Sequence, residues 1–185
     1  MLTLSLLLLL TTSIASVSSG FGKCPTKSET AIPIWPSFIR DWYDYASYGD
    51  LTNSIFRKCI KYSFTSTQNT VHAKREFSVK LFNTQGSSHY TIASGGIENF
   101  NMIGEEFLTW TINNVWLIDA DYDKYLILWS CDEHLFGTFS KESSWILTRN
   151  RTEILNKDIE TKIKNVLEKH NMDLSWYSPV SQSGC

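Results

Sequence analysis

Three aspartates at alternate positions are the best candidates for acid–base chemistry in this 185-residue chain: Asp119, Asp121 and Asp123. Such chemistry needs one carboxyl group that is desolvated and a second that stays charged. The same spacing is typical of a polar loop whose aspartate side chains bond nearby backbone groups. We favour the loop interpretation, so the stretch predicts no catalytic pair.

Histidine and serine offer no stronger catalytic pattern. Ser63, Ser78 and Ser130 have no nucleophile-elbow motif around them. The four histidines lack the spacing of metal ligands: His72, His89, His134 and His170. The sequence therefore predicts a protein that is not an enzyme and that holds no metal and no cofactor.

The four cysteines indicate an oxidising compartment. They stand far apart in the chain, so none forms a CxxC redox or zinc pair: Cys24, Cys59, Cys131 and Cys185. An even number of cysteines in an exported chain predicts two disulfides. Three pairings are possible, and the cysteine count does not choose among them.

The first 20 residues have the pattern of a secretory signal peptide. Residues 2–10 are almost all leucine, too few to span a bilayer, and residues 11–20 are small and polar. We expect cleavage after Gly20, with a buried N-terminal helix as the alternative. The mature chain, residues 21–185, is then a single secreted domain without a transmembrane anchor. Asn150-Arg151-Thr152 is a sequon, which predicts glycosylation of Asn150.

Composition excludes some functions and leaves others open. Lys and Arg number 17 against 19 Asp and Glu, for a net charge of −2, so no basic field would attract nucleic acid or anionic lipid. Aromatic residues make up 14% of the chain. That many large rings predict either a densely packed core or a cavity lined by rings.

The region from Trp42 to Arg149 is predicted to be all β. Short runs of β-branched and aromatic residues alternate with turn formers, which gives eight or nine strands at hairpin spacing. This pattern is typical of an antiparallel sandwich or barrel. The expected strands are residues 43–46, 59–64, 76–82, 89–92, 106–112, 115–119, 124–131, 137–139 and 144–148.

One segment near the C-terminus has a helical period. Apolar residues recur at helical spacing, with charged residues on the other face: Leu155, Ile159, Ile163, Val166 and Leu167. Thr152 or Asn156 could cap its first turn. We expect a helix at about residues 153–170 whose apolar stripe packs against the sheet.

Three motifs, in order, resemble those of the lipocalin family. FIRDWYDYA at residues 38–46 is similar to the G-x-W-Y-x-x-A motif of its first strand. ADYDKY at residues 120–125 is close to the T-D-Y-x-x-Y turn, and WILTR at residues 145–149 is like the W-I-L-x-R of its last strand. The resemblance is closest to apolipoprotein D and the insect bilin-binding proteins, and it extends to plasma retinol-binding protein.

The resemblance implies an eight-stranded antiparallel up-and-down β-barrel, at about residues 42–149, with one C-terminal α-helix packed on its outside and a tail to residue 185. It implies that Arg149 packs across Trp42 at the closed end of the barrel. An acidic ligand as the partner of Arg149 is the alternative. The resemblance also implies the disulfide pairing Cys24–Cys131 and Cys59–Cys185.

Alternation along the strands predicts the wall of a ligand pocket. Trp42 at the base puts Asp44, Ala46 and Tyr48 inward, and a buried Asp44 is costly unless a hydrogen bond or a ligand satisfies it. For the other strands, the resemblance to retinol-binding protein implies these inward residues: Val79, Leu81, Tyr90, Ile92, Val115, Leu117, Asp119, Leu126 and Leu128.

The implied function is that of a secreted carrier or scavenger of one small hydrophobic ligand, such as a lipid, a retinoid, a sterol or a tetrapyrrole like biliverdin. One alternative is an interaction protein that contacts a membrane or a protein through the open-end loops, with Phe56 in loop 51–57 as the apolar candidate. For this loop we favour the interpretation that it forms a lid over the ligand. A lipid-modifying enzyme would need a free thiol, and two disulfides leave none. A haem-binding form would use His89 or His134.

Overall fold

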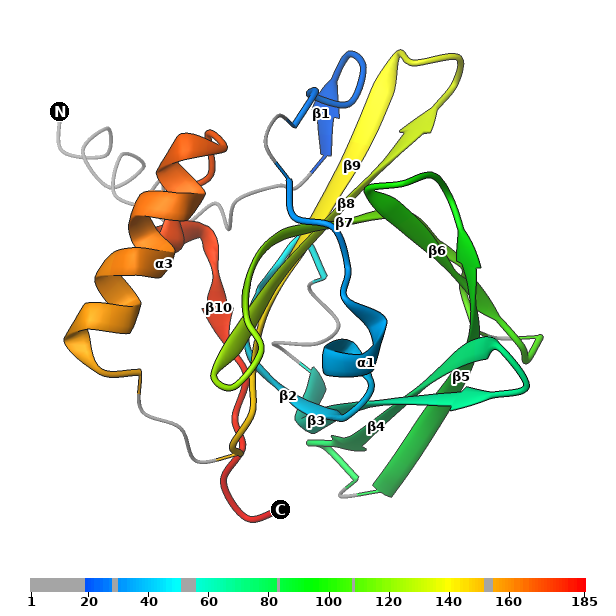
Figure 1. The fold of residues 1–185 in the computed structure, drawn as a ribbon, viewed down its shortest axis with the longest axis vertical. Helices are drawn as coiled ribbons and strands as arrows, with labels where there is room; N and C mark the ends of the chain where they lie inside the picture. The colour runs from blue at the N-terminus through cyan, green and yellow to red at the C-terminus, as the bar shows by residue number, and fades with distance from the viewer. Residues whose placement is uncertain (1–18, 28–29, 51–55, 83, 108, 152–154) are drawn as a thin grey trace, which may run out of the picture.

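The chain forms a closed antiparallel β-barrel with one long helix against its outside (Figure 1). The structure is a computed structural model, and it describes residues 19–27, 30–50, 56–82, 84–107, 109–151 and 155–185. Eight strands follow the barrel wall in chain order: β2 (Asp41–Tyr48), β3 (Arg57–Thr67), β4 (Thr70–Val79), β5 (Thr84–Ser94), β6 (Asn99–Gly104), β7 (Ile112–Asp121), β8 (Tyr125–His134) and β9 (Phe139–Thr148).

The sheet closes because its first and last strands pair. Each barrel strand is hydrogen-bonded to the next, and β9 returns to β2, with Tyr43 opposite Thr148 and Tyr48 opposite Ser144. A closed sheet has no unpaired edge within its ring. The expected barrel is therefore confirmed, and the sandwich is excluded.

One of the expected strands is wrong, and two other expected strands are parts of a single strand. The fifth barrel strand is β6, in which Phe100 and Met102 are buried and alternate with Asn99 and Asn101. Of the segment expected as a strand at residues 106–112, only Ile112 is in a strand, as the first residue of β7. The described residues before it connect β6 to β7, with a turn in which the Thr109 amide donates to the Glu106 carbonyl. The runs at 137–139 and 144–148 belong to the single strand β9.

The short helix α1 (Trp35–Phe38) covers the closed end of the barrel (Figure 1). Phe38 is fully buried, and its ring meets those of Phe64 at 4.7 Å and Phe100 at 5.9 Å, both edge-on. Edge-to-face contacts of this kind favour a fixed ring arrangement. The aromatic residues at this end of the barrel therefore form a packed core.

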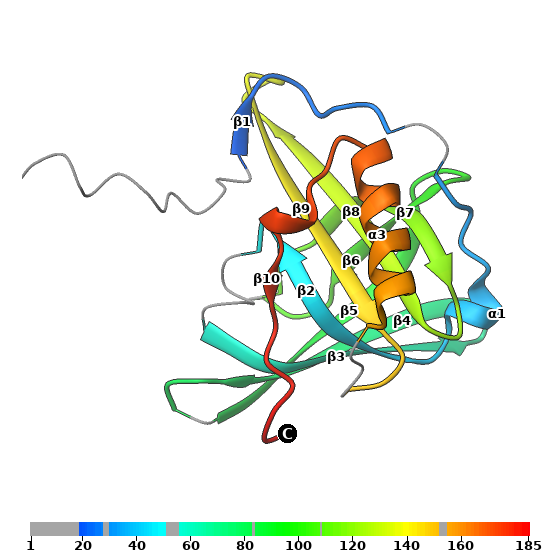
Figure 2. The same cartoon turned by 90° about the vertical axis from the view of Figure 1, so that its left-hand side faces the viewer.

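The helix α3 (Lys157–Lys169) lies across the outside of β7, β8 and β9 (Figure 2). Asn156 caps it by accepting a hydrogen bond from the Ile159 amide, so the helix begins later than expected. Ile163 and Leu167 are fully buried against an apolar patch on the barrel's outer face. This cluster is separate from the barrel interior, so the barrel wall has two apolar faces here. Within the described residues, no helix is long and apolar enough to cross a membrane.

The N-terminal segment is held against β8 and β9. The strand β1 (Ser19–Phe21) pairs with Lys141–Phe139 of β9, and the disulfide Cys24–Cys131 anchors the next residues to β8. The expected cleavage point after Gly20 lies within β1, and the rest of the expected signal peptide, residues 1–18, lies outside the described part of the chain.

The C-terminal tail fills a seam in the barrel wall. β2 pairs with β3 only at Asp41–Tyr43, and beyond that point the tail lies between the two strands. On one side the Val180 amide donates to the Tyr45 carbonyl at 3.0 Å, within the pairing of β10 (Ser178–Pro179) with β2. On the other side the Cys59 amide donates to the Ser181 carbonyl at 2.8 Å.

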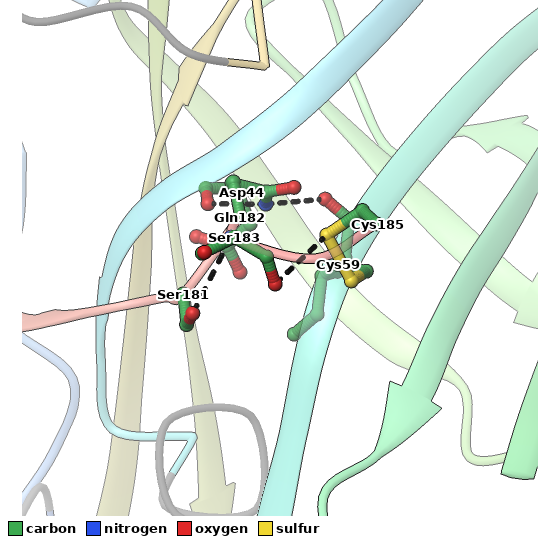
Figure 3. Close-up of a disulfide and its surroundings, with 7 residues drawn as sticks. Asp44, Cys59, Ser181, Gln182, Ser183 and Cys185 are labelled. Carbon is green, nitrogen blue, oxygen red and sulfur yellow. Dashed lines mark hydrogen bonds between the residues drawn. A yellow bond between two sulfur atoms is a disulfide. The ribbon is translucent and has the colours of Figure 1, made fainter. Parts of the chain in front are cut away.

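A disulfide fixes the tail at this seam. Cys59 is bonded to Cys185, with 5.6 Å between the Cα atoms, and lies beside Gln182 (Figure 3). Cys59 has a left-handed backbone (φ 58°) inside a bulge of β3, between Lys58 and Lys61. A bulge redirects a side chain out of the regular alternation. The two disulfides are the pairing that the resemblance implies.

Replacing Cys59 and Cys185 together with alanine should lower the free energy of unfolding by about 2–4 kcal/mol, because the bond closes a long loop of the unfolded chain. Urea unfolding measures this loss. Hydrogen exchange at the Val180 amide should also become faster, because the tail is then held only by its hydrogen bonds.

The control is the variant Cys24→Ala/Cys131→Ala, which opens a loop of similar length, 107 residues against 126. It should lose similar stability but keep the Val180 amide protected. Equal protection of Val180 in both variants would contradict the role of the Cys59–Cys185 bond at the seam.

Candidate functional site

The interior of the barrel is the enclosed space that the fold creates. One face of each strand, together with Phe38 of α1 and Val180 of the tail, forms a continuous buried cluster. Its large members are mostly aromatic: Phe38, Trp42, Tyr62, Phe64, Tyr90, Phe100, Met102 and Trp145. The high aromatic content of the chain predicted either a packed core or a cavity lined by rings. In the barrel the aromatic side chains both line the wall and fill the interior.

Little room is left inside. A cavity of about 10 Å³ lies in the described part of the interior, with Tyr62, Phe64 and Trp145 in its wall. A site of that size holds about one water molecule. Any larger ligand must therefore displace side chains, and the rings of Tyr62 and Trp145 are those next to the cavity.

The closed end is sealed by Arg149 and Trp42. The guanidinium of Arg149 lies 3.5 Å from the centre of the Trp42 ring, a cation–π contact. Its nitrogens also donate to three backbone carbonyls, those of Ser37, Asp41 and Tyr122, at 2.7–3.1 Å. Burial lowers the pKa of Arg149 to about 10, which still leaves it charged at neutral pH. Arg149 is thus bound by groups of the protein itself, as the resemblance implies, and the alternative of an acidic ligand as its partner is not needed.

Asp44 is the unusual residue of the interior. Its side chain is fully buried, and neither carboxylate oxygen has a hydrogen-bond partner among the described residues. Burial raises the pKa of Asp44 well above its usual value of 3.8, the charge of Asp50 raises it further, and Arg75 opposes both. A buried carboxyl group without partners costs stability unless something pairs with it.

Gln182 holds the backbone at Asp44 in place. Its side-chain amide donates to the Asp44 carbonyl at 2.9 Å and to the Ile60 carbonyl at 3.0 Å (Figure 3). The amide therefore bridges β2 and β3 at the seam that the tail fills. The carboxyl group of Asp44 does not take part in these bonds, so the tail fixes its position without satisfying it.

Other polar groups surround this carboxyl group. Arg75 is almost fully buried and pairs with Asp50, with 3.8 Å between nitrogen and oxygen. Tyr62 lies opposite Arg75 in the strand pairing, and burial raises the pKa of its hydroxyl. The indole nitrogen of Trp145 is also buried without a hydrogen-bond partner in the described part of the chain. We call Asp44, Asp50, Tyr62 and Arg75 the interior polar cluster.

Seven of the expected pocket residues face the interior. Asp44 follows the alternation from Trp42, and the other six belong to the interior apolar cluster or pack against it: Tyr90, Ile92, Val115, Leu117, Leu126 and Leu128. Val79, at the end of β4, has the parity of Phe77 and is partly exposed.

Four expected pocket residues do not face the interior. Ala46 and Tyr48 pack on the helix side, because a bulge between Asp44 and Ala46 shifts the alternation of β2. A second bulge, between Leu117 and Asp119, turns Asp119 outward, where it accepts from the Tyr125 hydroxyl at 2.5 Å. Leu81 lies in the turn after β4 and is 77% exposed.

The candidate catalytic and haem-binding residues do not converge. Asp121 accepts a hydrogen bond from the Asp123 amide in the β7–β8 turn, as expected for a loop. His89 points outward from β5 to Glu106, and His134 is exposed at the end of β8. Among the described residues, no group of three or more His, Cys, Asp and Glu side chains could hold a metal ion.

The sequence contained signals for some of the residues that were missed. Trp145 and Leu147 share the parity of Arg149, so the base of the barrel predicts that both point inward. Arg75 is a charged residue between Ala73 and Phe77, which pack inside. Its role could not be read from alternation alone, because the partner Asp50 lies outside any strand.

Comparisons with known proteins agree with this geometry. Residues 59–183 match the model of the lipocalin / cytosolic fatty-acid binding protein family. Lazarillo protein from Schistocerca americana is 26% identical over 152 residues, 79% of this chain and 68% of that protein. Apolipoprotein D from Cavia porcellus is 31% identical over 70 residues, 38% of this chain and 35% of that protein. The structure of insecticyanin from the tobacco hornworm Manduca sexta superimposes with a TM-score of 0.72 at 18% identity, over 90% of this chain and 89% of that one.

Asp44→Asn should change how stability depends on pH. Because the pKa of Asp44 is higher in the folded than in the unfolded chain, the folded protein holds more protons between the two pKa values. Wild-type stability should therefore fall as pH rises from about 4 through the folded pKa, by about 1.4 kcal/mol for each unit of pKa difference. The asparagine variant lacks this loss, so its stability advantage over the wild type should grow as the pH rises above about 4.

Thermal and urea unfolding at several pH values measure this difference. Asp123→Asn is the control, because it makes the same change at an exposed position of the closed end. It should follow the wild-type pH profile. An Asp44→Asn profile parallel to that of the wild type would contradict a carboxyl group with a raised pKa.

Proposed function

The chain belongs to the lipocalin / cytosolic fatty-acid binding protein family, and we propose that it is a secreted carrier or scavenger of one small hydrophobic ligand held inside the barrel. One observation carries this proposal: the barrel encloses an aromatic interior in which a fully buried carboxyl group has no partner among the described residues. Small-molecule sites combine an apolar wall with a few polar groups that fix orientation.

The packing of the interior limits the ligand. Because the cavity measures about 10 Å³, affinity has to exceed the cost of moving side chains. A slim acyl chain or a single ring displaces fewer side chains than a sterol or a tetrapyrrole. Among the ligand classes that the sequence suggests, this favours a slender lipid or retinoid over the rigid polycyclic compounds.

The covalent features support export. Two disulfides are typical of extracellular proteins, and they are consistent with the signal peptide expected at residues 1–20. Asn150, the expected glycosylation site, is exposed after β9, while Thr152 of its sequon lies outside the described residues. All four cysteines of the sequence are in disulfides, so the chain lacks the thiol that the lipid-modifying alternative needs.

A second candidate function is contact with a membrane or protein through the open-end loops. Phe56, of the loop expected at residues 51–57, is 58% exposed, and residues 51–55 lie outside the described part of the chain. Other large apolar side chains are exposed on the remaining connections at this end: Leu81, Phe82, Phe107, Trp110, Leu135 and Phe136. Clusters of this kind mark contact sites.

Trp145→Ala should strengthen binding of an apolar ligand, because it enlarges the interior next to the existing cavity. Trp129→Ala is the matched control, since Trp129 packs on the helix side of the same wall. Native mass spectrometry and tryptophan fluorescence with palmitate, retinol, cholesterol and biliverdin measure binding. We expect one ligand per chain, with a gain of affinity only in Trp145→Ala.

Circular dichroism first establishes that both variants fold, since each loses a buried side chain at a cost of about 3–5 kcal/mol. If folded Trp145→Ala and Trp129→Ala bound alike, the ligand would not lie inside the barrel. If neither the wild type nor the variants bound any compound of the panel, the carrier function would be wrong.

For the second candidate, Phe107→Ser combined with Phe136→Ser should abolish sedimentation with phosphatidylcholine vesicles. Both side chains are fully exposed at the open end, and apolar burial drives such binding. Ile97→Ser is the control, because Ile97 is equally apolar and 81% exposed near the closed end. Equal loss in both variants, or no vesicle binding by the wild type, would refute open-end membrane contact.

A further inference from the structure

The carboxyl group of Asp44 is held at a fixed place and left unpaired. Gln182 and the strand pairing of β2 fix its backbone, while both carboxylate oxygens lack partners among the described residues. The side chain is fully buried in the barrel, so solvent does not satisfy it either. A rigid, unsatisfied acceptor in an enclosed site favours a ligand that donates hydrogen bonds to it.

Two arginines belong to this part of the barrel, and neither of them contacts the Asp44 carboxyl group. Arg75, the buried cation of the interior polar cluster, is engaged by Asp50 at 3.8 Å. Arg57 lies further out, at the first residue of β3, where its guanidinium packs 4.2 Å from the Phe77 ring. Neither guanidinium forms an ion pair with Asp44 among the described residues. The Asp44 carboxylate, when ionised, is therefore a buried charge in this region that no cation contacts among the described residues.

The wall around this charge suits a cation. Tyr62, Tyr90 and Trp145 are buried aromatic residues of the interior, and aromatic faces attract ammonium groups. A neutral hydrocarbon would leave the Asp44 carboxyl group unsatisfied, and an anion would be repelled by it. A protonated amine on a small apolar body satisfies the carboxylate, the rings and the limited space together.

We propose that the barrel takes a small primary amine, whose ammonium group pairs with Asp44 while its apolar part displaces the rings beside the interior cavity. This assignment rests on the ligand-binding function proposed above and names the chemical class of the ligand. The amine binds without covalent change. Asp44 supplies the charge, Gln182 positions it, and the aromatic wall supplies the apolar contact.

Binding should release a proton. Burial raises the pKa of Asp44 and so favours its protonated form in the free protein, whereas the ion pair needs the carboxylate. The groups that act on this equilibrium are Asp50, which favours protonation, Arg75, which opposes it, and the Tyr62 hydroxyl. Amine affinity should therefore weaken as the pH is lowered through the pKa of Asp44, while a neutral ligand is unaffected.

Three compounds of similar shape and different charge test whether the barrel prefers a cation. The probes are 2-phenylethylamine, 2-phenylethanol and 3-phenylpropionate, titrated calorimetrically into the full disulfide-bonded chain at pH 7.5. We expect the amine to bind about 10- to 100-fold more tightly than the alcohol, the usual effect of a charged hydrogen bond. Repeating the amine titration in buffers of different ionisation enthalpy measures the released proton.

Asp44→Asn should reduce amine affinity to that of the alcohol and abolish proton release, while alcohol affinity stays within about threefold, because the amide keeps the shape of the side chain without its charge. Asp123→Asn, at the exposed closed end, should behave as the wild type. Thermal unfolding shows that Asp44→Asn is folded, so lost binding would not reflect lost structure.

Each of the following outcomes would refute the proposal that the ligand is an amine. If the amine and the alcohol bind equally, the barrel binds ligands but the charge of Asp44 plays no part in binding. Preferential binding of 3-phenylpropionate assigns the site to anions and to Arg75. If no amine binds up to about 10 mM while palmitate or retinol still binds, the amine proposal is refuted and the carrier function stands. If no compound binds at all, both proposals are refuted.

Discussion

The whole structure depends on how the first strand of the barrel, β2, is paired. A barrel avoids an exposed edge only if every strand has two neighbours. β2 has β9 along one side, but β3 along only the first part of the other. The C-terminal tail supplies the missing neighbour, and the Cys59–Cys185 disulfide keeps it there. Closure of the barrel thus depends on residues at the far end of the chain.

The strand β2 also carries Trp42, at the closed end of the interior, and Asp44, the buried carboxyl group. Trp42 stacks under Arg149 at the closed end, and Asp44, the next residue on that face, lies where β2 separates from β3. The bulge directly after Asp44 shifts the alternation, so that Ala46 and Tyr48 face the helix. Asp44 is therefore the last inward residue before the bulge, and it lies beside the tail.

An unpaired buried carboxyl group lowers stability, and the rest of the interior is packed well enough to tolerate it. Aromatic residues fill the barrel to within about 10 Å³, and α3 buries a second apolar cluster outside. Natural proteins retain local costs of this kind mainly at functional sites. The cost at Asp44 is the physical basis of the proposed ligand class, because an apolar residue there would pack without penalty.

Much of the fold was predicted from the sequence, and two of the errors in the pocket wall share one cause. The resemblance carried by the motifs around Trp42 and Arg149 implied the barrel and its closed end, and the helical period near Ile163 predicted the outer helix. Alternation failed at Ala46 and Asp119, because each follows a bulge, and a bulge inverts every residue after it. No local signal announces such an insertion. The role of the tail was missed in the same way, since its hydrogen bonds join residues more than 120 positions apart.

The most direct measurement is the titration of the Asp44 carboxyl carbon by NMR, in protein labelled with ¹³C at aspartate and assigned with Asp44→Asn. We predict a pKa well above 3.8 for Asp44 in the free protein, because burial disfavours the charge. We also predict that saturating 2-phenylethylamine lowers this pKa, because the ammonium group favours the carboxylate. A carboxyl group that titrates near 3.8 in the free protein, or that does not respond to the amine, would contradict these predictions.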